Sequence, residues 1–342
     1  MSWSSRCLVV ALSSTALLGG CKAWFRKPAA SPAAAAAVSA PAVPLVPTAP
    51  EQALLDQAEL HLQSGSHEQA LAEFNQLLAE NPYLPDAWVG VGDVMAAQGR
   101  YREAEPAYTR ATELDPGDFN AQVGRGQSLL ALGRTVDGIR AMHRALTING
   151  EAAEVHISMA SAYLVLGQPE AAVGYGERAV ALMPENAAAR INLGAAYERT
   201  GKPGAAASQY EVAMELMPPT PQLYINLVNV YAADGRHAEA LNAARELCRV
   251  SPSPNSFERL GWAQFRAGDY AASIAAYRSA VEMDTQYWPA WNGIGVNAMN
   301  TWLQSAKRDS FAANEARDAF RRSLQVNPNQ PKLVRLMMTH SL

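Results

Sequence analysis

From residue 51 onward, apolar side chains recur every three or four positions in stretches of about 12 to 14 residues, and short polar turns separate these stretches. This spacing places the apolar residues on one face of an α-helix, whereas a half-buried strand would alternate apolar and polar residues. Alanine is frequent and Val, Ile and Thr are sparse, which also favours helix over strand. The pattern therefore predicts a succession of amphipathic helices.

The predicted helices come in pairs that repeat every 34 residues. Three sets of positions show this period. Residues that end the second helix of a pair are Pro82, Pro116, Gly150, Pro184, Pro218 and Pro252. Glycines that permit a left-handed cap on the first helix are Gly65, Gly99, Gly133, Gly167, Gly201 and Gly235. Small residues within the second helix are Ala70, Ala104, Gly138, Ala172, Ala206 and Ala240. Neither helix of a pair can bury its apolar face alone, so the pairs are expected to stack.

The repeat resembles the tetratricopeptide family. The stretch WVGVGDVMAAQGRYREAEPAYTRATELDP (88–116) supplies Trp88, Gly92, Gly99, Ala104, Tyr108, Ala111 and Pro116 at that family's characteristic positions. The resemblance implies an all-α fold, a right-handed α-solenoid of antiparallel helix pairs. Eight repeats are expected over residues 51–330, near 51–84, 85–118, 119–152, 153–186, 187–220, 221–253, 254–287 and 288–330. Residues 331–342 are expected to form a helix that caps the exposed apolar end.

Two repeats depart from the pattern. The fourth has Gly176 where a large aromatic side chain is usual, which predicts looser packing there. The eighth is nine residues too long, about 2.5 turns of helix, so each of its two helices should be longer by roughly one turn. Trp302 and Phe311 are expected to pack across the longer hairpin.

The N-terminus has the layout of an export signal, because Arg6 precedes a short apolar run and the small residues Gly19 and Gly20. Leu18–Gly19–Gly20–Cys21 resembles a bacterial lipobox, which implies cleavage after residue 20 and lipid attachment at Cys21. An ordinary secretion signal that ends near a cysteine is the alternative. Residues 21–50 are rich in proline and alanine and are expected to be a disordered tether.

Composition argues against several classes of function. The formal net charge is −4, which does not favour nucleic acid as a partner. The six histidines lack metal-ligand spacing, and no nucleophile elbow or phosphate-binding loop occurs. Short Gly-x-Gly runs at 90–92, 124–126 and 293–295 are interpreted as small positions in the middle of helices. Cys248 is interpreted as a small core residue. We expect no enzymatic activity, no cofactor, no metal and no small-molecule substrate.

The resemblance implies that the first helices of the repeats form a concave face that binds extended peptides. The residues carried over as candidates are Asn192, Asn226, Asn229, Trp262, Arg266, Asn292 and Asn300. An asparagine amide both donates and accepts, so it can pair with a peptide backbone whatever its side chains. The alternative is that these asparagines are helix-surface residues that face water. The lysine-rich carboxylate clamp of chaperone-binding members is not matched.

These features together predict a non-enzymatic adaptor for proteins or extended peptide segments, anchored by lipid to a membrane. Lys22 after Cys21 favours an outer-membrane lipoprotein that faces the periplasm. The general resemblance is to tetratricopeptide lipoproteins of tight-adherence (Flp-type) pilus assembly. The alternative is an accessory subunit that recruits substrate for a separate enzyme such as a glycosyltransferase.

Overall fold

The computed structural model describes residues 46–342. Cys21, the predicted signal and most of the predicted tether lie outside the described residues. The described chain divides into two compact units, one that extends to Leu132 and one that spans Gly133–Leu342.

Each unit consists of α-helices, and the part of the chain that the structure describes contains no strand. Unit 1 holds α1 (Ala49–Gln63), α2 (His67–Glu80), α3 (Pro85–Ala97), α4 (Tyr101–Leu114) and α5 (Phe119–Ala131). Unit 2 holds α6 (Thr135–Ile148), α7 (Ala153–Val165), α8 (Pro169–Leu182), α9 (Ala187–Arg199), α10 (Pro203–Leu216), α11 (Pro221–Ala233), α12 (His237–Val250), α13 (Pro254–Arg266), α14 (Tyr270–Met283), α15 (Trp288–Gln304), α16 (Ser310–Val326) and α17 (Pro331–His340). The predicted all-α fold of helix pairs is confirmed.

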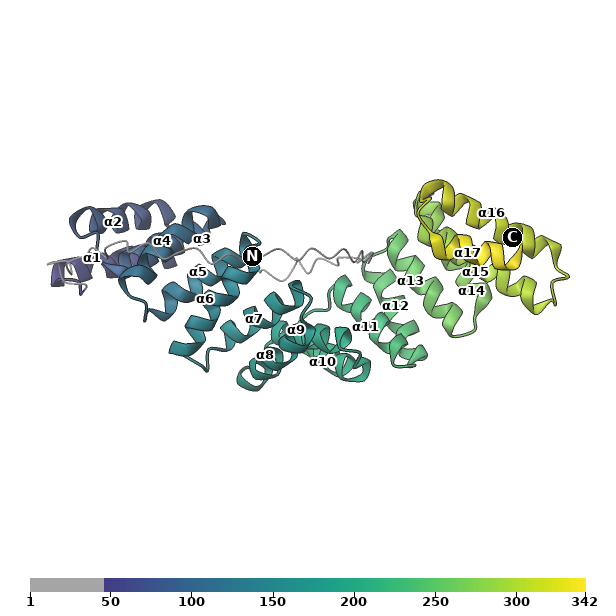
Figure 1. Cartoon of the computed structure of the whole chain (residues 1–342), viewed down its shortest axis with the longest axis horizontal. Coiled ribbons are helices and arrows are strands. Elements are labelled where there is room, and N and C mark those ends of the chain that lie inside the picture. Colours follow the sequence, from purple (N-terminus) through teal and green to yellow (C-terminus); the bar gives the residue numbers. More distant parts are fainter. Residues whose placement is uncertain (1–45) are drawn as a thin grey trace, which may run out of the picture. The chain divides into compact units, whose positions relative to one another are not determined.

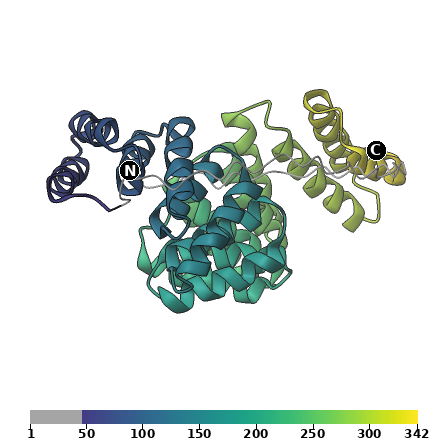
Figure 2. The same ribbon diagram turned by 60° about the vertical axis from the view of Figure 1, so that its left-hand side comes forward.

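Consecutive helices within each unit pack as antiparallel pairs, and neighbouring pairs lie side by side (Figure 1, Figure 2). We call the first and second helix of a pair helix A and helix B. In unit 2 the A helices contact one another in the series α7–α9, α11–α13 and α13–α15. The A helices therefore share a face of the stack, which we call the helix-A face.

The turn between helices A and B uses the predicted glycine. The residues Gly65, Gly99, Gly133, Gly167, Gly201, Gly235 and Gly268 all have positive φ, from +70° at Gly167 to +83° at Gly268. A side chain in this region would clash with the backbone, so glycine ends helix A and turns the chain into helix B without strain. The left-handed caps predicted from the sequence are confirmed.

The core is built mainly of alanine, leucine and valine side chains, and aromatic rings of B helices fit into it against glycines of A helices. Tyr210 is fully buried, and a Cβ added at Gly194 would lie 2.7 Å from its ring. Tyr277 sits in the same way against Gly261 and Gly293, and at Gly293 an added Cβ would lie only 2.2 Å from the ring. The absence of a Cβ thus lets each ring pack directly on helix backbone, which buries large apolar area.

The expected loosening at Gly176 is wrong. Leu193 of the next A helix approaches so closely that a Cβ at Gly176 would lie 3.2 Å from two of its side-chain atoms. Neighbouring Tyr175 stacks instead on Tyr163, with ring centroids 5.3 Å apart. The missing aromatic ring is therefore compensated by a closer approach of α8 and α9.

The eighth pair has longer helices, as predicted. Its helices α15 and α16 each have 17 residues, against 13 and 14 in the pair α13/α14. Trp302 packs on the core of this pair, and the ammonium group of Lys307 lies 5.3 Å from its ring centroid. The expected packing of Phe311 is wrong, because this side chain is 78% exposed at the start of α16.

Candidate functional site

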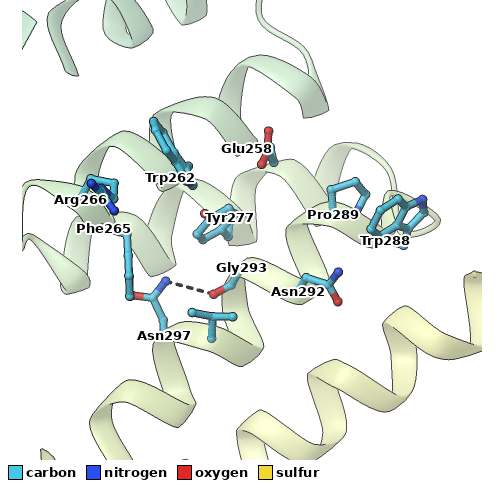
Figure 3. A pocket seen from close by; sticks show the side chains of 11 residues that line it. Glu258, Trp262, Phe265, Arg266, Tyr277, Trp288, Pro289, Asn292, Gly293 and Asn297 are labelled. Carbon is cyan, nitrogen blue, oxygen red and sulfur yellow. Dashed lines mark hydrogen bonds between the residues drawn. The ribbon is translucent and has the colours of Figure 1, made fainter. Parts of the chain in front are cut away.

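A cleft of about 540 Å³ opens on the helix-A face of unit 2, between α13 and α15 (Figure 3). We call it the α13–α15 cleft. Its lining side chains come from two A helices, and the ring of Tyr277 from α14 lies between them. The lining residues are Glu258, Trp262, Phe265, Arg266, Tyr277, Trp288, Pro289, Asn292, Gly293, Val296 and Asn297.

Helical spacing explains why these side chains share one cleft. On α13, Glu258, Trp262 and Arg266 follow one another at intervals of four residues and therefore lie on one side of the helix. On α15, Trp288, Asn292 and Val296 do the same. The two rows face the cleft from opposite sides, and its surface is mostly apolar and aromatic.

Asn297 supplies a buried polar group to this apolar cleft. The side chain is only 1% exposed, and its Nδ2 donates to Ser273 Oγ and to the carbonyl of Gly293, both at 3.0 Å. Ser273 Oγ in turn donates to the carbonyl of Gly261 at 2.6 Å. The Oδ1 atom of Asn297 is buried and accepts no hydrogen bond from any described residue. The cleft thus contains an acceptor without a donor.

Asn292 adds a second such acceptor. Its Nδ2 donates to Gln330 Oε1 at 2.8 Å, which orients the amide. Its Oδ1 is buried and has no hydrogen-bond partner among residues 46–342. Two amides on one helix therefore use their donors within the chain and leave their acceptors unused.

Glu258 is the one acidic side chain in the lining of the cleft. Burial raises the pKa of its carboxyl group, and the neighbouring charge of Arg259 opposes this shift. Arg259 itself points to α11, where its Nη1 donates to Asn229 Oδ1 at 2.6 Å. Within the described chain, Glu258 forms no hydrogen bond or ion pair. Burial and the charge of Glu258 together raise the pKa of Tyr287 to about 12.

The cleft brings together three of the seven candidates chosen from the sequence, Trp262, Arg266 and Asn292. Asn300 lies two turns beyond Asn292 on α15, and its Nδ2 is buried with no hydrogen-bond partner among the described residues. These four candidates therefore belong to the helix pairs around the α13–α15 cleft.

The other three candidates lie outside the cleft, and their amides bond within the chain. Asn192 Nδ2 donates to the carbonyl of Ile157 at 3.3 Å, from α9 to α7. Asn226 Oδ1 accepts from Gln222 Nε2 at 2.9 Å, and Asn229 Oδ1 accepts from Arg259. At least one polar atom of each amide thus contributes to the fold. Peptide binding by these three side chains stays a prediction.

Sequence reasoning missed Asn297, Tyr277 and Trp288 as candidates. A signal for Asn297 was present, because Ser273 occupies the position where most repeats have alanine. A hydroxyl at this small-residue position needs a buried polar partner, and Asn297 is that partner.

A second cleft, of about 510 Å³, lies within unit 1 and is acidic. Its lining includes Glu59, Asp86, Asp93 and Asp118. Burial and the nearby acidic groups raise the pKa of Asp86 and of Asp93, and the hydroxyl of Tyr108 donates to Asp93 Oδ1 at 2.6 Å. Within residues 46–342, no cluster of three or more His, Cys, Asp or Glu side chains is placed to hold a metal ion.

The remaining sequence-based interpretations concern Gly-x-Gly runs, Cys248 and membranes. The run at 293–295 lies in the middle of α15, where Gly293 and Gly295 pack against aromatic rings, so it is a packing feature. Burial raises the pKa of the Cys248 thiol, which disfavours the reactive thiolate. None of the described helices has the length and apolar character needed to cross a bilayer.

Comparison with solved structures shows the same fold in other proteins. A tetratricopeptide repeat protein from Parabacteroides merdae is 16% identical, with a TM-score of 0.50, and the alignment covers 72% of this chain and 98% of that one. The pilF protein of Pseudomonas aeruginosa is 17% identical, with a TM-score of 0.54 and coverage of 64% and 97%. The C-terminal part of a repeat protein from Cytophaga hutchinsonii is 16% identical, with a TM-score of 0.57 and coverage of 70% and 99%.

The family comparison is more specific. No curated protein sequence matches this chain. The tetratricopeptide repeat model, however, matches residues 26–85, 55–118, 91–153, 157–219 and 225–287, which together span well over half of the chain. The period of 34 residues, the stacked helix pairs and these matches agree, and the chain belongs to the tetratricopeptide repeat family.

Proposed function

We propose that this protein is a non-enzymatic adaptor that holds an extended segment of a partner protein on the helix-A face of unit 2. The tetratricopeptide fold indicates a protein-interaction scaffold. The observation that supports this site is the α13–α15 cleft, which combines half-buried aromatic side chains with two amide acceptors that the fold leaves unused. Aromatic surface supplies affinity for a peptide, and placed polar groups fix its orientation.

The adaptor works at the bacterial cell envelope. Cys21 carries the lipid in this proposal, and the proline-rich residues up to the start of α1 are the tether that holds the repeats away from the membrane. The support is the lipobox-like run before Cys21 and the composition of the tether. An outer-membrane position facing the periplasm and a part in assembling a pilus or secretion machine complete the proposal.

The interaction is tested by affinity purification of the full chain from membranes, with Trp262→Ala as the variant. Trp262 is half-buried in the cleft, so its loss removes contact surface while the neighbouring core clusters keep their buried residues. We expect protein partners with the wild type and a severalfold loss with the variant. Recovery of the same partners in the same amounts with Trp262→Ala would contradict the proposed site. A glycosyltransferase among the partners would favour the accessory-subunit alternative.

A further inference from the structure

The unmet hydrogen-bonding needs of the α13–α15 cleft are all of one kind. Asn297 Oδ1 and Asn292 Oδ1 are buried acceptors with no donor among the described residues, and Glu258 is a partly buried carboxylate without an ion pair there. A buried acceptor without a donor costs about 1–3 kcal/mol. A ligand that carries several N–H donors would remove this cost at more than one of the three positions.

The walls of the cleft are suited to a positive charge. Trp262 presents its half-buried ring to the cleft, and Trp288 lines the cleft at the start of α15 (Figure 3). Aromatic faces attract cations, and Trp attracts them most strongly. Guanidinium in particular is planar, weakly hydrated and rich in donors, so it can stack on a ring and bond to separate acceptors at the same time.

We propose that the α13–α15 cleft receives an arginine side chain of the bound partner segment. This inference rests on the proposed function, and it adds the chemistry of the residue that the cleft selects. The guanidinium group lies at the Glu258 end of the cleft, pairs with that carboxylate and donates to the Asn292 oxygen, while Asn297 lies nearer to Phe265 and Arg266 (Figure 3).

Arg266 also lines the cleft, and its positive charge would repel a guanidinium group placed beside it. It lies eight residues after Glu258 on the same helix, which is about 12 Å along the axis, and its side chain is exposed. Figure 3 shows Glu258 and Arg266 on opposite sides of Trp262. The cleft therefore has a negative and a positive end, and Arg266 disfavours a reversed placement of the guanidinium.

The other charged neighbour of Glu258 does not neutralise the cleft. Arg259 opposes the burial effect on Glu258, but its Nη1 donates away from the cleft to Asn229. Tyr277 and Tyr287 also lie within the influence of Glu258, and both phenols are neutral at physiological pH because burial raises their pKa. The charge of Glu258 thus remains available to a ligand.

The test uses the full chain and short extended peptides of alanine and serine with one central residue varied. The central residues are arginine, lysine, citrulline, leucine and glutamate, and binding is followed by the fluorescence of the cleft tryptophans. Citrulline has the shape of arginine without its charge. We expect the arginine peptide to bind roughly tenfold more tightly than the citrulline peptide, with lysine between them.

Glu258→Gln tests the acidic end of the cleft. We expect the arginine peptide to bind this variant roughly tenfold more weakly, down to the affinity of the citrulline peptide. Glu282→Gln, an exposed position on α14, removes the same charge outside the cleft and should leave binding unchanged. Unfolding curves check that each variant is folded.

Equal binding of arginine and citrulline peptides, or unaltered arginine binding by Glu258→Gln, would overturn the proposal. If leucine or glutamate peptides bind best and Trp262→Ala abolishes that binding, the arginine proposal fails while the adaptor function stands. A different result would contradict the proposed adaptor site itself: Trp262→Ala would then recover the same partners in the same amounts as the wild type.

Discussion

Asn297 Nδ2 donates to Ser273 Oγ at 3.0 Å, and this bond joins α15 to α14 beneath the α13–α15 cleft. Because Nδ2 also donates to the carbonyl of Gly293, the amide plane is held from two sides. The orientation that results presents Oδ1 as an acceptor without a partner in the described chain. Ser273, which replaces the alanine found in most repeats, therefore helps to orient the amide whose Oδ1 is left without a donor.

Ser273→Ala tests this arrangement. The change removes one acceptor from Asn297 Nδ2 and the donor to the carbonyl of Gly261, so we expect a loss of about 1–3 kcal/mol in the free energy of unfolding. Urea unfolding of the full chain measures it. Ser279→Ala on the same helix is the control and should change stability by less than about 0.5 kcal/mol. Equal effects of the two changes would show that the buried bond contributes nothing.

Gly293→Ala tests the fit between α15 and Tyr277. An added Cβ would lie 2.2 Å from the ring, so the ring or the helix must move. We expect a loss of about 1–3 kcal/mol, reduced by the better helix propensity of alanine. Gly174→Ala in α8 is the matched control, since a Cβ there meets nothing within 4 Å. The control should stabilise the protein by up to about 1 kcal/mol. If thermal unfolding shows that Gly293→Ala stabilises the protein, the close packing of Tyr277 against Gly293 is contradicted.

Glu258→Gln should change the pH dependence of stability in a defined direction. Burial raises the pKa of Glu258 in the folded protein above its ordinary value of 4.5. Between those two pKa values the folded state binds more protons than the unfolded state, so the free energy of unfolding falls as pH rises through this window. The variant lacks this fall. It should therefore be more stable than the wild type at neutral pH, and this advantage should shrink as the pH drops toward and below 4.5.

Melting temperatures of the wild type and Glu258→Gln across this pH range test the prediction. Burial raises the pKa of the neighbouring Tyr277 and Tyr287, so both phenols stay protonated throughout this range and the difference between the two proteins reports Glu258. If the melting temperatures of the two proteins differ by the same amount at every pH, the raised pKa of Glu258 is contradicted. The predicted stability gain would accompany weaker binding of arginine peptides, a trade-off that marks a binding residue.

Cys21→Ser tests the proposed anchor. Without a thiol no diacylglyceryl group can be attached, so we expect the protein to move from the membrane fraction to the soluble fraction. Cys7→Ser is a matched control within the predicted signal and should leave the fractionation unchanged. Membrane retention of Cys21→Ser equal to that of the wild type would refute lipid attachment at this residue.

Much of the fold could be predicted because the repeat is local. Each glycine with positive φ falls where the period of 34 residues places it, or one residue earlier at Gly268. Seven of the nine extra residues of the eighth repeat lengthen α15 and α16 relative to α13 and α14, and the other two lengthen the turn between them. Local patterns predict such features since helix ends depend on nearby residues. Phe311 was harder to place, because its burial depends on how the longer hairpin twists against its neighbours.

The candidate site could be predicted only in part, because contacts between repeats depend on how the repeats stack. Position within the repeat identified Trp262, Arg266 and Asn292, which line the cleft. It could not show that Asn229 holds Arg259 of the next pair, since a bond between residues 30 positions apart depends on the stacking of two repeats. Ser273 signals a buried polar partner in the sequence, but only the packing of α14 against α15 identifies that partner as Asn297.

The central claim is that the α13–α15 cleft holds a partner protein, and site-specific photocrosslinking in intact cells tests it most directly. A benzophenone side chain in place of Phe265 lies in the cleft, and the same group in place of Met283, which is 51% exposed and outside the cleft, serves as the control. We predict a discrete crosslinked partner from position 265, with an arginine close to the attachment point, and none from position 283. No crosslink at position 265, or the same products from both positions, would contradict the claim.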